Sequence, residues 1–174
     1  IARAYRASFY LDLARLFDPL YAEVDINAET YEQGCIDAQG LTVPIVTEAT
    51  TEKIAKDNDR ATREEIFNFI FADLEDALVC LEGYAQEKPF YPTEAFIHGL
   101  YARAYMWLGG EDFVNDGLNG ELPSGLAAYE LAKQHAEKAL QFSGGAIMTE
   151  DQWTNTTTGF NTVVPAWIMS AVYS

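Results

Sequence analysis

Aromatic residues outside the expected helices are the clearest candidates for ligand binding in this sequence. These rings are Tyr21, Tyr31, Phe90, Tyr91, Trp153 and Phe160. A flat ring can pack against the apolar face of a pyranose while neighbouring amides and carboxylates bind the sugar hydroxyls. Trp153 lies among such polar residues, so we expect ligand binding by Trp153, Asn155, Tyr21 and Tyr31. The alternative is that Trp153 anchors its loop against the helices.

Carboxylates and histidines are the other side chains that could take part in catalysis. A glycosidase needs two carboxyl groups at a set separation, one with a raised pKa, and no spacing among the 27 acidic residues singles out such a pair. His98 and His135 fall in expected helices without a nucleophile motif or a nearby Cys or His, so we interpret them as packing or surface residues. We therefore expect no catalytic residue, no enzymatic activity and no cofactor.

An acidic segment, Asp112 to Gly117, raises the question of calcium. An EF-hand loop needs an oxygen ligand at its third position and Glu at its twelfth, where this chain has Val114 and Pro123. The motif fails, and we expect no metal site. A looser oxygen site in this segment stays open as an alternative to a solvated loop, built from Glu111, Asp112, Asp116 and Glu121.

Composition excludes several classes of protein. The chain has 174 residues, is 49% hydrophobic and carries a formal net charge of −16, which repels nucleic acid and anionic lipid surfaces and favours neutral over acidic sugars. No apolar run reaches the roughly 20 residues that cross a bilayer. The two cysteines, Cys35 and Cys80, are too few to indicate a disulfide framework.

Hydrophobic periodicity predicts a mostly α-helical fold. Four helices are expected, over about Ala2–Phe17, from Thr62 to Gly83, from Pro92 or Thr93 to Gly109, and over about Leu126–Phe142. Thr62 and Glu65 have the spacing of a capping box. Long excursions separate the helices, and the first of them contains a short extended segment at Leu41–Thr47. Aromatic residues at helical spacing are expected to pack between helices.

An internal repeat relates the two halves of the helical part. Asp73–Leu78 matches His135–Leu140, and Ala7–Leu16 matches Gly99–Leu108. Small and aromatic residues in the second half resemble a tetratricopeptide repeat, namely Ala102, Tyr105, Leu108, Gly109, Ala132 and Ala139. The sequence thus predicts paired helices of an α-α superhelix with long loops and little β structure.

Five segments, taken in order, resemble the SusD/RagB family. They are Arg3–Phe17, Gly40–Glu48, Arg60–Leu78, Ala102–Gly109 and Ala132–Leu140. The resemblance implies a surface-exposed outer-membrane lipoprotein of Bacteroidetes type that binds a glycan and delivers it to a SusC-like TonB-dependent transporter. It also implies that the helical scaffold contacts the transporter. Contact with the membrane would be made only through a lipid anchor upstream of Ile1.

The resemblance also bears on the domain organisation, and two alternatives to the function that it implies stay open. Residues 1–174 are expected to form one helical-repeat domain of a longer chain, because the apolar stretch from Val163 to Tyr173 needs partners to bury it. Two other functions stay open. One is a helical-repeat adaptor that binds other proteins, and the other is an all-helical glycosidase.

Overall fold

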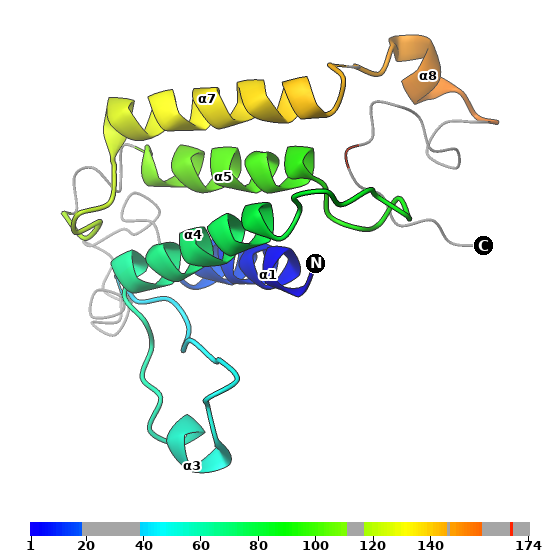
Figure 1. Cartoon of the computed structure of the whole chain (residues 1–174). Helices are drawn as coiled ribbons and strands as arrows, with labels where there is room; N and C mark the ends of the chain where they lie inside the picture. Colours follow the sequence, from blue (N-terminus) through cyan, green and yellow to red (C-terminus); the bar gives the residue numbers. More distant parts are fainter. Residues whose placement is uncertain (19–38, 111–116, 146, 158–167, 169–174) are drawn as a thin grey trace.

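The described part of the chain folds into helices joined by turns and irregular segments. The computed structural model describes residues 1–18, 39–110, 117–145, 147–157 and 168 (Figure 1). Its helices are α1 (Ala2–Phe17), α3 (Glu52–Ala55), α4 (Arg63–Val79), α5 (Glu94–Leu108), α7 (Gly125–Phe142) and α8 (Glu150–Thr154). Within the described residues the only β pairing is an isolated bridge between Leu41 and Thr62. The prediction of a mostly α fold is confirmed.

Side-chain caps set the beginnings of several helices. Thr62 and Glu65 form the expected capping box at α4, in which each side chain accepts a hydrogen bond from the other residue's backbone N–H. The Thr93 hydroxyl accepts from the Phe96 N–H at the start of α5. The second helix was predicted to continue to Gly83, whereas α4 ends at Val79 and a turn follows. Gly83 itself has a positive φ of 75°, which glycine adopts without steric cost.

The long helices pack as two pairs. α1 packs mainly against α4, and α5 packs mainly against α7, while α5 also touches α4 and α1 and so joins the pairs (Figure 1). The core between the pairs contains large apolar side chains from α1, α4 and α5, including Leu11, Ile66, Phe67, Ile70, Leu74, Ile97 and Leu100. This is the paired-helix arrangement that the sequence predicted.

α7 makes a different kind of contact from the other long helices. Its buried residues are the alanines Ala128, Ala132 and Ala139. Small side chains let two helix backbones approach closely. Gly109, at the end of α5, shows how close this approach is, because a Cβ atom there would lie 2.8 Å from the Tyr129 ring.

A buried polar network ties the helix ends together. The Arg63 Nε atom at the start of α4 donates to the Asp18 carboxylate after α1 over 2.5 Å, and both side chains are fully buried. Arg63 also donates to the Asn119 side chain over 2.9 Å, and Asn119 donates to the Leu108 carbonyl at the end of α5 over 3.2 Å. The Gly40 N–H donates to Asp18 over 2.9 Å. Buried charges are tolerated because each has a partner.

Candidate functional site

The short helix α8 carries the leading candidate for ligand binding. Its N-terminus has a capping box made by Thr149 and Gln152, which fixes the first turn. Trp153 lies on this helix with 57% of its surface exposed, so most of the indole is accessible. Asn155 follows as the C-cap residue, and its side-chain oxygen accepts a hydrogen bond from the Thr157 N–H over 2.8 Å.

The structure thus places two of the four expected site residues on one exposed element. Asp151 and Gln152, the polar neighbours of Trp153, are exposed as well. Tyr21 and Tyr31 lie outside the described residues. An accessible indole beside carboxylate and amide groups has the chemistry that stacks on a pyranose and binds its hydroxyls.

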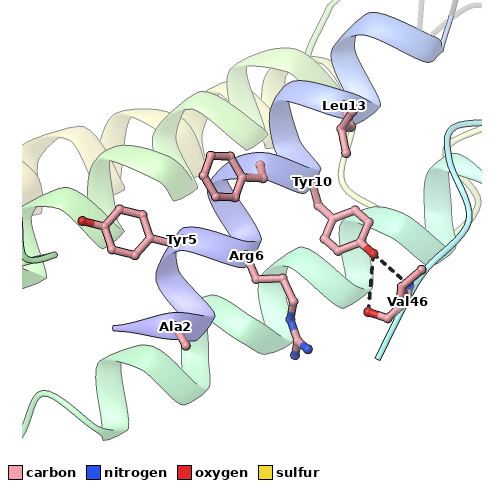
Figure 2. A pocket seen from close by; sticks show the side chains of 7 residues that line it. Ala2, Tyr5, Arg6, Tyr10, Leu13 and Val46 are labelled. Carbon is pink, nitrogen blue, oxygen red and sulfur yellow. Dashed lines mark hydrogen bonds between the residues drawn. The ribbon is translucent and has the colours of Figure 1, made fainter. Parts of the chain in front are cut away.

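A mostly apolar groove of about 450 Å³ lies along α1 (Figure 2). It is lined by Ala2, Tyr5, Arg6, Phe9, Tyr10, Leu13 and Val46. The Tyr10 hydroxyl accepts a hydrogen bond from the Val46 N–H over 2.8 Å and so fixes one wall. Phe9 is 65% exposed, which leaves an apolar ring directed to solvent. Apolar residues on most sides of the α1 segment favour burial between neighbouring elements, and the exposed Phe9 ring shows that this expectation is wrong for one face of the helix.

Ion pairs hold α1 and α4 together beside this groove. Arg6 makes a two-point contact with Asp73 on α4, with Nε–Oδ2 and Nη2–Oδ1 distances of 2.6 and 2.8 Å, and Arg3 adds a contact of 2.8 Å. Burial favours a higher pKa for Asp73, but the hydrogen bonds and charges of Arg6 and Arg3 together lower it. A general acid of a glycosidase needs a raised pKa, so Asp73 does not fit that role.

A second groove, of about 530 Å³, is lined by residues of α4, α5 and α7. Its residues are Asn68, Phe71, Ala72, Glu75, Leu78, His98, Tyr101, Tyr105, His135 and Lys138. The rings stack on one another, with interplanar angles of 5° for Phe71 and Tyr101 and 23° for Phe71 and Tyr105. Ring faces that pack together are not free for a sugar. The structure therefore supports the packing role that the sequence predicted for these aromatics.

His98 and His135 meet in this second groove. Their Nδ1 atoms are 3.0 Å apart, so the two histidines are neighbours in space, although neither has another His or a Cys near it in the sequence. Burial lowers the pKa of both, and the pKa of His135 falls further, to about 4, through the neighbouring His98 and Lys138. The internal repeat makes His98 equivalent to Arg6 and His135 equivalent to Asp73, so this contact corresponds to the Arg6–Asp73 ion pair of the first helix pair.

The other features that the sequence singled out are the acidic segment, the two cysteines and the apolar stretches. Among the described residues, no group of three or more His, Cys, Asp or Glu is arranged to hold a metal ion. Glu111, Asp112 and Asp116 lie outside the described residues, whereas the Glu121 N–H donates to Glu64 over 3.0 Å. Cys80 is exposed, and Cys35 is outside the described part. None of the described helices is both long and apolar enough to span a bilayer.

Taken together, the described residues define an α-helical protein with two stacked helix pairs and an exposed tryptophan on a short separate helix. Comparison of the chain with protein-family models, curated proteins and solved structures gave no match.

Proposed function

We propose that the chain is part of a SusD-like, non-catalytic protein that binds a glycan at the bacterial surface and passes it to a TonB-dependent transporter. The observation that carries this proposal is the exposed Trp153 with Asp151, Gln152 and Asn155 beside it. In this proposal the indole face packs on a sugar ring, and the three polar side chains bind the hydroxyl groups.

The helical scaffold has a supporting role in the proposal. The capping box at Thr149 limits the conformations of α8, so less conformational entropy is lost when a sugar binds. The formal charge of −16 favours a neutral glycan over an acidic one. The ordered motifs that resemble the SusD/RagB family support docking of the helical pairs on the transporter, with a lipid anchor upstream of Ile1.

Calorimetric titration of the full-length protein with a panel of neutral polysaccharides tests this proposal. For the sugar that binds, Trp153→Ala is expected to weaken affinity by about tenfold or more, because the stacking surface is lost. Phe9→Ala is the matched control, since it removes another aromatic ring that is more than half exposed, from α1. Unchanged affinity in Trp153→Ala would remove this residue from the site, and an absence of binding across the panel would exclude the function.

A second candidate function, a protein-binding adaptor, is favoured by the exposed apolar side chains of α1. Phe9, Leu16 and Phe17 are 65%, 76% and 51% exposed, and such an apolar surface suits the side chains of a partner helix or peptide. A fluorescence-anisotropy screen with apolar helical peptides would detect this activity. We expect Phe9→Ala to abolish peptide binding and to leave glycan binding unchanged. If no peptide binds the unaltered protein, the adaptor function is excluded.

A further inference from the structure

The groove lined by residues of α4, α5 and α7 brings together both histidines of the chain. His98 lies on α5 and His135 on α7, with their Nδ1 atoms 3.0 Å apart. The whole sequence contains two histidines. Histidine is the side chain whose ordinary pKa lies between pH 5 and pH 8. A histidine titration measured in this protein therefore reports on this one contact between two helices.

The distance between the two nitrogens restricts the charge that the pair can carry. At 3.0 Å one Nδ1 atom must donate a hydrogen bond and the other must accept it. Two neutral imidazoles satisfy this requirement, and so does a pair that has taken up one proton. A second proton makes both Nδ1 atoms donors and places two positive charges next to each other. The contact can therefore exist with no added proton or with one, but not with two.

The surroundings also oppose a second positive charge. His98 stacks on Phe142 with ring centroids 5.5 Å apart, and His135 stacks on Tyr101 at 4.4 Å. The polar and titratable groups of the groove are Asn68 and Glu75 on α4, Tyr101 and Tyr105 on α5, and Lys138 on α7. Burial lowers the pKa of both histidines, and the Lys138 charge lowers it further. Glu75 is the single carboxylate among these lining residues.

α7 is the helix that depends most on this contact. Its buried side chains are three alanines, each of which contributes little apolar area. The histidine pair forms a side-chain hydrogen bond between α5 and α7. Loss of the pair therefore affects α7 before it affects α4, which buries several large apolar residues.

We propose that the His98–His135 contact is an acid-sensitive latch, which holds α7 on α5 until the pair takes up its second proton and then releases α7. Release widens the groove that the two histidines line. In the released state both histidines return toward the ordinary pKa of 6.5. As the pH falls from 6.5 toward about 4, the released state binds protons that the latched state excludes. Acid therefore favours release, and a return to neutral pH reverses it.

Hydrogen–deuterium exchange of the full chain between about pH 7 and pH 4.5, corrected for intrinsic exchange rates, tests the latch. Protection of the α7 amides should fall with acid by up to roughly tenfold per pH unit for each excluded proton, while α4 keeps its protection. His135→Asn keeps a nitrogen donor facing His98 but does not titrate, so its acid response should be smaller. Lys133→Gln, an exposed change on the same helix, should respond like the unaltered protein. Equal acid responses in His135→Asn and the unaltered protein would refute the latch.

Proton NMR titration of the two imidazole rings provides a test that needs no variant. Both midpoints should lie below 6.5. Two independent titrations near 6.5 would overturn the proposal. Neither experiment contains a glycan, so failure of the latch and failure of the proposed function are distinguishable.

Discussion

Equivalent positions in the two helix pairs hold contacts of different chemistry. The register that matches Asp73–Leu78 with His135–Leu140 makes Asp73 equivalent to His135, and the register of the inner helices makes Arg6 equivalent to His98. The first pair joins its helices by the Arg6–Asp73 ion pair, whereas the second joins them by two imidazoles. The repeated architecture therefore keeps the place of a polar contact while changing how that contact responds to protons.

The apolar contacts differ between the pairs as well. α4 buries Ile66, Phe67, Ile70 and Leu74, whereas α7 buries only alanines. The repeat matches Leu74 with Ala136, which is exposed. Burial of large side chains is the main favourable contribution to folding, so the first pair forms the stable part of the scaffold and α7 is added to it.

The largest expected effect tests this difference in burial. Leu74→Ala should lower the free energy of unfolding by about 2–5 kcal/mol, because it leaves a cavity in a fully buried site. Ala136→Leu at the matched position should change it by less than about 0.5 kcal/mol, because the site is on the surface. Urea denaturation followed by circular dichroism measures both values. A similar loss in the two variants would contradict the comparison.

The next effect concerns the ion pair of the first helix pair. Asp73→Asn should lower the free energy of unfolding by about 1.5–3 kcal/mol, because it removes charged hydrogen bonds from Arg6 and Arg3 at a buried position. Asp12→Asn is the control, since its ion pair with Arg103 is exposed and is expected to contribute less than about 1 kcal/mol. Urea denaturation of both variants measures the two losses in the free energy of unfolding. Equal losses would contradict the view that burial makes the Asp73 ion pair more stabilising.

Acid should separate the two pairs by the pH at which each weakens. The histidines have lowered pKa values in the folded state, so their contribution declines as the pH falls from 6.5 toward about 4. Asp73 also has a lowered pKa, but its ordinary value is 3.8, so its contribution persists above that pH and is lost below it. Hydrogen exchange along a pH series should show α7 losing protection before α1 and α4. Simultaneous loss in all three helices would contradict this order.

The smallest expected change in the free energy of unfolding concerns two glycines, one inside α5 and one at its C-terminal end. Gly109→Ala should lower the free energy of unfolding by about 1 kcal/mol, because its Cβ atom would meet the Tyr129 ring at the close approach of α7. Gly99→Ala, inside the same helix with no heavy atom within 4 Å of the new Cβ, should raise it by about 0.5–1 kcal/mol. Thermal unfolding of the two variants should give melting temperatures on opposite sides of the unaltered protein.

Local signals in the sequence were sufficient to predict the long helices. The Thr62–Glu65 capping box and the glycines after Leu108 and Phe142 placed their ends to within a few residues. The short helix α8 was missed, although Thr149 and Gln152 have capping-box spacing, because no hydrophobic period follows them. A five-residue helix leaves too short a pattern to detect.

Contacts between distant segments were harder to predict, because they depend on how the helices pair. The buried Asp18–Arg63 ion pair joins residues from different helix ends, and no local pattern marks either residue. The His98–His135 contact is intermediate, since the repeat implies it once the helices are taken as paired. Of the expected site residues, Trp153 and Asn155 are on the surface as a ligand site requires.

The hydrogen bond from Gly40 to Asp18 makes one backbone position part of the buried charge pair. The Gly40 N–H donates to the Asp18 carboxylate over 2.9 Å, and the Gly40 carbonyl accepts from the Arg63 N–H over 2.6 Å. Gly40 has a positive φ of 70°, which residues with a side chain rarely adopt. The Asp18–Arg63 ion pair therefore depends on the backbone conformation of a glycine as well as on its own two side chains.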